Sequence, residues 1–232
     1  MLVLALDTTT RAGSVAVVRD RTTLSQRSGD PALTHGARLP LELTAALEEA
    51  SVPLDAVELL AVAAGPGSFT GLRVGIATMQ GLAMATGLRI VPVSVLDALA
   101  KSVDPTGVDR APIAAWMDAQ RGEVFAALYD ASGSRVIVEP TAATPAQTLD
   151  GWRTRADGTV PRFIGDGAMR YASIIRAALG HAVEIVEPPP LAPVIGRLAC
   201  DAPERAVDPH ALVPIYIRRP DAELARARRE HA

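Results

Sequence analysis

A nearly continuous apolar run at residues 57–64 (VELLAVAA), stopped by Gly-Pro-Gly at 65–67, constrains the fold more than any other stretch of the chain. Strands buried on both faces of a parallel sheet have this composition, because helices cover both sides of the sheet. Ser68 follows the glycines and is placed to cap a helix that extends to about Thr86 and ends at Gly87. The segment is therefore predicted to supply a central strand and the helix that follows it.

Further elements extend this unit in both directions. Apolar runs at 2–6 and 14–18 flank a hydroxyl-rich turn from Asp7 to Gly13, and this arrangement predicts a β-hairpin. The other elements expected here are strands at 24–28 and 89–93 and a helix from Ser94 to about Ser102. The alternation of strands and helices indicates a three-layer α/β unit.

A helix is also expected at 37–50, where Leu39, Leu43 and Leu47 recur at helical spacing. Pro40 lies within this stretch, and proline fits only the first turn of a helix because it lacks an N–H group. The regular helix is therefore predicted to begin near Leu39.

The polar stretch at 103–110 (VDPTGVDR) is the predicted domain boundary. We expect a first lobe at 1–104 and a smaller second lobe at 105–232, with the C-terminal tail docking back on the first. The second half is expected to contain strands at 113–118, 123–129, 136–139, 162–165 and 183–186 and helices at 145–153, 168–179 and 193–200. The predicted fold class is α/β, with two lobes of mixed sheets flanked by helices.

Composition excludes several classes of protein. The 232 residues carry a formal net charge of −3 and are 49% apolar, which is enough for a buried core and argues against a protein that coats nucleic acid. The single cysteine, Cys200, excludes an intramolecular disulfide and any multi-cysteine metal site. The N-terminus MLVLALDTTT lacks a basic region and no apolar run is long enough to span a bilayer, so we expect a cytoplasmic protein without membrane contact.

The loop from Gly65 to Gly71 could hold an anion, because free N–H groups point outward at the start of a helix. Its glycine spacing differs from the dinucleotide-binding fingerprint, and no acidic residue ends the strand at 89–93. A Walker A loop is absent, since no Gly-Lys-Ser/Thr run occurs. A tight turn capped by Ser68 is therefore favoured over catalysis by Ser68.

The Asp7 turn is a second candidate site. Asp7, Thr8 and Thr9 could hold a nucleotide phosphate or, through the carboxylate, its magnesium ion. The alternative is a turn whose side chains satisfy their own backbone.

The helix predicted at 68–86 contains Gly71, Gly75 and Gly81. Each internal glycine costs about 1 kcal/mol relative to alanine, so close packing is expected to offset the loss. Two partners remain open for these small residues, the sheet of this chain and a second protein.

Histidine spacing argues against a metal site. The four histidines are isolated, and none forms a pair at helical spacing with another. We therefore expect no two-histidine metal site on a single helix, and neither a metal site nor an activated catalytic nucleophile occurs in recognisable spacing.

Six motifs occur in a fixed order. They are LALDTTT near the start, His35 with Arg38-Leu39, GPGSFTGLRVGIA at 65–77, MDAQRGEVF at 117–125, FIGDGA at 163–168 and PIYIRRP at 214–220. In these motifs the chain resembles the TsaB (YeaZ) family over residues 1 to about 220. That family supplies the dimerisation subunit of the bacterial machinery that makes tRNA threonylcarbamoyladenosine.

The resemblance implies a two-lobed fold of the actin, Hsp70 and sugar-kinase type (ASKHA). It also implies a heterodimer with the catalytic paralogue TsaD, an ATPase partner TsaE, homodimers of the isolated chain, and tRNA contact only through the complex. No cofactor is expected, and the Asp7–Thr9 turn becomes a vestigial phosphate loop. The expected interface residues are His35, Leu39, Leu43, Leu47, Phe69, Thr70, Leu72, Arg73, Gly75, Ile76 and Met79.

The resemblance also implies that catalysis takes place on the paralogue. TsaD carries a His-x-x-x-His pair on the helix that matches the His35 region, whereas this chain has Leu39 at the second position. The function expected from the sequence is a non-catalytic scaffold that supports TsaD. A weak ATP-binding or ATP-hydrolysing protein and a glycoprotease-like peptidase are the alternatives.

Overall fold

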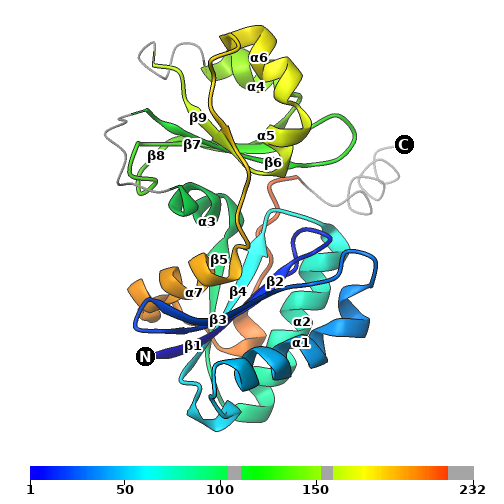
Figure 1. Ribbon diagram of the computed structural model, residues 1–232, viewed down its shortest axis with the longest axis vertical. Coiled ribbons are helices and arrows are strands. Elements are labelled where there is room, and N and C mark those ends of the chain that lie inside the picture. The colour runs from blue at the N-terminus through cyan, green and yellow to red at the C-terminus, as the bar shows by residue number, and fades with distance from the viewer. Residues whose placement is uncertain (104–110, 153–158, 219–232) are drawn as a thin grey trace, which may run out of the picture.

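Two five-stranded sheets, one above the other, form the framework of the molecule (Figure 1). The computed structural model describes residues 1–103, 111–152 and 159–218. The first sheet has the order β3-β2-β1-β4-β5, with β1 (Leu2–Asp7), β2 (Ser14–Arg19), β3 (Thr22–Ser28), β4 (Leu59–Gly65) and β5 (Ile90–Ser94). The second has the order β10-β9-β6-β7-β8, with β6 (Ile113–Asp118), β7 (Val124–Tyr129), β8 (Val136–Ala143), β9 (Arg162–Ile164) and β10 (Ile185–Val186). Each sheet mixes parallel and antiparallel pairs, so the predicted α/β fold of two mixed sheets is confirmed.

Helices cover the faces of the sheets. They are α1 (His35–Glu49), α2 (Phe69–Thr86), α3 (Val95–Ser102), α4 (Pro145–Trp152), α5 (Asp166–Arg170), α6 (Ala172–Leu179) and α7 (Ala192–Asp201). Side chains alternate between the two faces of a strand. In β1, Leu4 packs in the core shared with α1 and α2, and Ala5 packs in the core shared with α3 and α7.

Strand β4 is central, as its apolar run predicted. It pairs in parallel with β1 on one side and with β5 on the other, and all its residues are buried. Ser68 caps α2 by accepting a hydrogen bond from the Gly71 N–H group at 3.3 Å. Gly87 ends the helix in the left-handed conformation, with φ 75°, so both predicted ends of α2 are confirmed.

The predicted start of the first helix is wrong. Helix α1 begins at His35 and includes Pro40 in its interior. Proline removes the hydrogen bond to the carbonyl of Gly36, four residues earlier. Both residues are exposed, so water can satisfy that carbonyl, and the proline does not end the helix.

The single helix predicted at 168–179 is also wrong, because it is divided into α5 and α6 at Tyr171 (φ −104°). Gly167 holds α5 against β6, and a Cβ atom there would lie 2.6 Å from the carbonyl carbon of Met117. Ile175 of α6 is fully buried in the same core as Ala168 of α5, but α6 packs against α4, whereas α5 packs against β6. The two helices therefore have different neighbours.

The chain returns to the first sheet near its end. Helix α7 follows the second sheet in sequence but packs against β1, β2 and β4. Helix α3 lies between the two sheets and contacts β4, β5 and β6. The predicted division between residues 104 and 105 falls outside the described residues, as does the chain after residue 218, and the two-lobe boundary stays a prediction.

Within the part of the chain that the structure describes, no helix has the length and apolar character needed to cross a bilayer.

Candidate functional site

The Asp7 turn is buried between the first sheet and α2. Asp7 Oδ1 accepts hydrogen bonds from the N–H of Thr9 at 2.9 Å and from its hydroxyl at 2.6 Å. The hydroxyl of Thr8 donates to the Gly71 carbonyl at 2.8 Å. These contacts match the alternative in which the turn satisfies its own groups. Burial raises the pKa of Asp7, and the hydrogen bonds from Thr9 oppose this rise.

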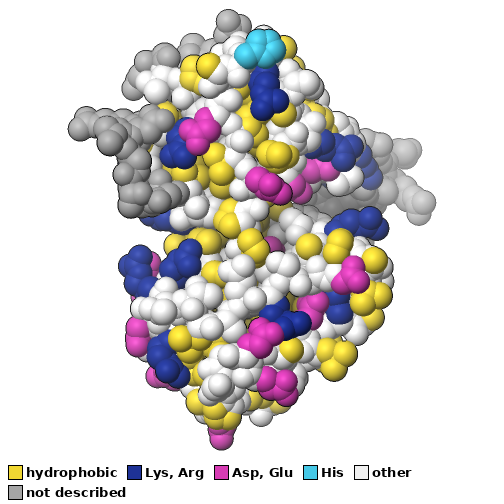
Figure 2. All heavy atoms as spheres, viewed as in Figure 1, with side chains coloured by type: hydrophobic (Ala, Val, Ile, Leu, Met, Phe, Trp, Pro, Cys, Tyr) yellow, Lys and Arg dark blue, Asp and Glu magenta, His cyan; other side chains and the backbone are white. Residues whose placement is uncertain are grey.

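Next to this turn, a cavity of about 710 Å³ lies between the two sheets. Figure 2 shows the waist that separates the two parts of the molecule at this level. Thr9, Thr10 and Gly67 line the cavity from the first sheet, and Asp118 and Asp166 line it from the second. Asp166 Oδ1 accepts a hydrogen bond from the Asp118 N–H at 3.0 Å, and burial raises the pKa of Asp166.

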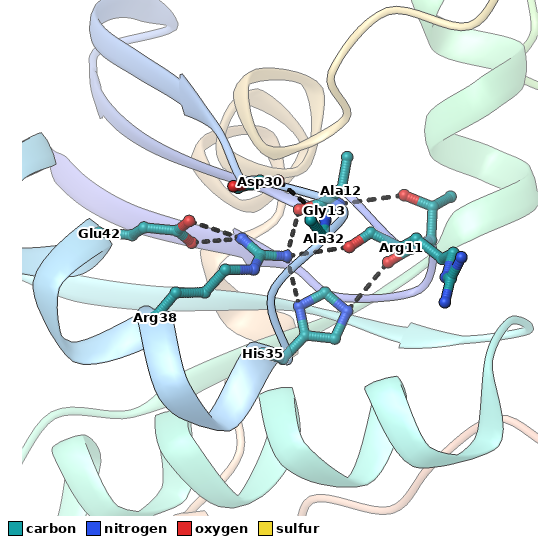
Figure 3. Close-up of polar contacts among 9 residues, drawn as sticks. Arg11, Ala12, Gly13, Asp30, Ala32, His35, Arg38 and Glu42 are labelled. Carbon is teal, nitrogen blue, oxygen red and sulfur yellow. Dashed lines mark hydrogen bonds and ion pairs between the residues drawn. The ribbon is translucent and has the colours of Figure 1, made fainter.

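A cluster around Arg38 binds the backbone of residues 10–12, which lie between Asp7–Thr9 and β2 (Figure 3). Arg38 is only 5% exposed, and its Nη1 donates to both carboxylate oxygens of Glu42 at 2.6 Å. Its Nη2 donates to the carbonyls of Arg11, at 3.1 Å, and Ala12, and to Nδ1 of His35 at 2.7 Å. Sequence reasoning missed this cluster, although the spacing of Arg38 and Glu42, four residues apart on a predicted helix, is the signal that could have revealed it.

Both ring nitrogens of His35 are engaged in this cluster. A guanidinium group only donates hydrogen bonds, so Nδ1 is the acceptor and Nε2–H donates to the Thr10 carbonyl at 3.0 Å. Burial, followed by the charge of Arg38, lowers the pKa of His35. Neither nitrogen is available to ligate a metal ion in this arrangement, and the described residues hold no group of three or more side chains suited to a metal.

Burial divides the interface residues expected from the sequence into two groups, and their role in an interface stays a prediction. Six of the expected residues are buried in the core of this chain and offer no surface to a partner; they are Leu39, Leu43, Leu72, Gly75, Ile76 and Met79. The helical stripes in which they occur face the first sheet, because α1 and α2 both cover it. His35 and Leu47 are half-buried, and Phe69, Thr70 and Arg73 are exposed.

The glycines of α2 have different neighbours. A Cβ atom at Gly71 would lie 2.1 Å from the Thr8 carbonyl oxygen, and one at Gly75 would lie 2.1 Å from the Thr8 hydroxyl oxygen. These two glycines therefore allow the helix to pack closely against the Asp7 turn of the same chain. A Cβ atom at Gly81 would meet nothing within 4 Å, so the small residue there faces open space.

Among the described residues, an exposed face remains on the outer side of α1 and α2. Thr70, Arg73, Ala77, Gly81 and Met84 are exposed and recur at helical spacing along α2. Met84 is 62% exposed. On α1, Leu41 is 75% exposed. The exposed row on α2 therefore combines small and apolar side chains with Thr70 and Arg73, and α1 adds the exposed apolar side chain of Leu41.

Comparison with known proteins agrees with this fold. The family model described as TsaD, tRNA N6-adenosine threonylcarbamoyltransferase, matches residues 30–190. A protein of Mycobacterium leprae is 32% identical over 230 residues, covering 96% of this chain, which spans only 56% of that longer protein. The tRNA threonylcarbamoyladenosine biosynthesis protein TsaB of Bacillus subtilis is 27% identical over 226 residues, covering 96% of each chain.

Solved structures support the same assignment. YeaZ from Pseudomonas aeruginosa superimposes with a TM-score of 0.76 at 30% identity, over 93% of this chain and 99% of that one. An activator of a 2-hydroxyisocaproyl-CoA dehydratase from Clostridium difficile shares only the fold, with a TM-score of 0.53 at 12% identity over 88% of this chain and 96% of that one. The fold is of the ASKHA type, and the chain belongs to the TsaB (YeaZ) family.

Proposed function

We propose that this chain is a non-catalytic subunit that supports a TsaD paralogue in the transfer of a threonylcarbamoyl group to the tRNA adenosine next to the anticodon. The name of the Bacillus subtilis relative places that protein in tRNA threonylcarbamoyladenosine biosynthesis, and the matching family model describes the transferase itself. The proposal assigns the chemistry to the partner and the assembly to this chain, in the cytoplasm.

The arrangement of His35 carries the non-catalytic part of the proposal. Its ring is held by Arg38 on one side and by the Thr10 carbonyl on the other, and the side chain four residues later is the buried Leu39. The positively charged guanidinium of Arg38 lies next to the His35 ring, and this charge disfavours binding of a metal cation there. The cluster thus stabilises the loop and leaves no ligand pair for a metal ion on this helix.

The outer face of α1 and α2 is the surface we assign to the TsaD paralogue. Exposed small residues allow a second helix to approach closely, and the apolar side chains of Leu41 and Met84 would be removed from water. A second copy of this chain would compete for the same face in the isolated protein. TsaE would join the assembly as a further subunit, and tRNA would be bound only by the complex.

A substitution at Gly81 tests this surface without disturbing the fold. Gly81→Leu adds a large side chain where nothing lies within 4 Å, and it gains helix propensity, so the free chain should melt no lower than the wild type. Over-packing of a close helix contact typically costs about 1–3 kcal/mol, and isothermal titration with the TsaD paralogue of the same organism should show a roughly 5- to 150-fold loss of affinity.

Gly151→Leu is the matched control. Gly151 is also an exposed helical glycine with nothing within 4 Å of a Cβ atom, but it lies in α4 on the second sheet. The affinity of the Gly151→Leu variant for the paralogue should be unchanged. If Gly81→Leu binds as tightly as Gly151→Leu, the assignment of this face is wrong.

A further inference from the structure

The segment from residue 212 to 218 crosses from the first sheet to the second, and we refer to it as the clasp. It follows the last short helical turn and runs upward between the two sheets in orange to red (Figure 1). At its start, Leu212 is buried in the core under the first sheet. The N–H of Ile215 then donates a hydrogen bond of 2.7 Å to the carbonyl of Ala64, near the end of β4.

The end of β4 is shaped to receive the clasp. Gly65 has φ 123°, and a Cβ atom there would lie 2.5 Å from the carbonyl oxygen of Ile215. Any side chain at this position would collide with the clasp backbone, so the glycine has a structural role in the contact. The ring of Tyr216 lies 5.9 Å from that of Phe69, the first residue of α2. The first sheet therefore holds the clasp by backbone and side chain.

Arg218, at the other end of the clasp, binds the second sheet. Its Nη1 donates to Glu123 Oε2 at 2.6 Å, and its Nη2 donates to the Ala119 carbonyl at 3.1 Å. Both acceptors lie in the hairpin turn between β6 and β7. The anchor at Arg218 lies three positions after the anchor at Ile215, so the extended chain between them spans at most about 10 Å.

The clasp lies at the large cavity, away from the junction of the two sheets at α3. At that junction α3 packs against both sheets, and the hydroxyl of Tyr129 in β7 donates to Asp97 of α3 at 2.6 Å. At the cavity, residues 215–218 themselves form part of the lining. A rotation of one sheet about α3 would change the distance between the end of β4 and the β6–β7 hairpin, which is the distance that the clasp spans.

We propose that residues 212–218 hold the two sheets at a fixed separation and that release of Arg218 from Glu123 and Ala119 opens the cavity between them. The separation of the sheets is then set by a short segment near the end of the chain as well as by packing at α3. The proposal concerns the chain by itself and does not depend on the function proposed above.

Distances between spin labels on the two parts of the molecule test the clasp. In the Cys200→Ser background, Glu204→Cys and Arg176→Cys place labels on exposed positions of the first and second parts, respectively. Labelled protein is diluted with unlabelled chain so that a second copy contributes no signal. We expect Arg218→Ala and Glu123→Gln each to broaden the distance distribution and shift it to longer values, while Arg19→Ala, at an exposed arginine of β2, leaves it unchanged.

Hydrogen exchange and a charge swap complete the test. Exchange at the Ile215 N–H should accelerate roughly two- to fivefold in Arg218→Ala, because partly exposed ion pairs make small contributions to local stability. The swap of Arg218→Glu with Glu123→Arg should return the distribution toward that of the parent. The proposal is overturned if Arg218→Ala and Glu123→Gln both give the same distances as Arg19→Ala.

Discussion

Replacing Gly75 by alanine tests how α2 packs on the Asp7 turn. The new Cβ atom would lie 2.1 Å from the Thr8 hydroxyl oxygen, where ordinary contacts begin at 3.4 Å. Thr8 is fully buried, and its hydroxyl donates to the Gly71 carbonyl at 2.8 Å, so it cannot turn away without losing that bond. The helix or the turn must therefore move.

Gly81→Ala is the matched control for this substitution. It gives the same gain of about 1 kcal/mol in helix propensity, but its Cβ atom meets nothing within 4 Å. The two variants then differ only by the over-packing cost at Gly75, about 1–3 kcal/mol. For a chain of this size we expect Gly75→Ala to melt about 2–12 °C below Gly81→Ala, as measured by calorimetry.

A double-mutant cycle with Thr8→Ala identifies the clash directly. Removing the hydroxyl should reduce the cost of Gly75→Ala, so the two substitutions should couple. Equal melting temperatures for Gly75→Ala and Gly81→Ala, together with no coupling to Thr8, would refute the close contact and return Gly75 to the candidate partner surface.

Three further predictions concern the buried polar groups. The pKa of Asp7 is raised in the folded protein, so the free energy of unfolding of the wild type falls as pH rises from 3.8 to the raised pKa. Asp7→Asn should flatten this pH dependence, and urea titrations in the acid range would measure the change. The pKa of His35 is lowered in the folded protein, so the wild type loses stability as pH falls below about 6.5. His35→Gln should flatten this pH dependence of stability, whose sign is opposite to that for Asp7, and melting curves from pH 7 to pH 5 would measure it. Arg38→Leu should cost about 3 kcal/mol in urea unfolding, because it leaves Glu42 and two loop carbonyls without their donor; a loss below about 1 kcal/mol would contradict the role given to the cluster.

Local signals predicted the elements of the first sheet well. The continuous apolar run of β4, the cap at Ser68 and the glycine at 87 each depend on a few neighbouring residues, so the sequence contains the whole signal. The start of α1 was predicted wrongly because the argument from Pro40 considered the lost backbone hydrogen bond but not whether water can replace it. The division of the helix at Tyr171 was missed because it depends on two packing partners that lie far apart in the sequence.

The candidate site was harder to predict because its contacts are long-range. Periodicity marks apolar stripes on α1 and α2, but it does not say whether a stripe faces the chain's own sheet or a partner. Leu39 and Met79 face the sheet, whereas the exposed row through Ala77 and Gly81 was recognised only in part. The return of the C-terminal segment to Ala64 and its anchor at Glu123 involve pairs that no local pattern connects.

Transfer of threonylcarbamoyl to tRNA in a reconstituted mixture tests the central claim most directly. The assay combines this chain with the TsaD paralogue and the TsaE ATPase of the same organism, adds unmodified tRNA, ATP and an activated threonylcarbamoyl donor, and measures modified adenosine in the tRNA. We predict that this chain alone transfers nothing, that the full mixture is active, and that omitting this chain abolishes the activity. Transfer by this chain alone, or full activity of the mixture without it, would contradict its assignment as a non-catalytic supporting subunit.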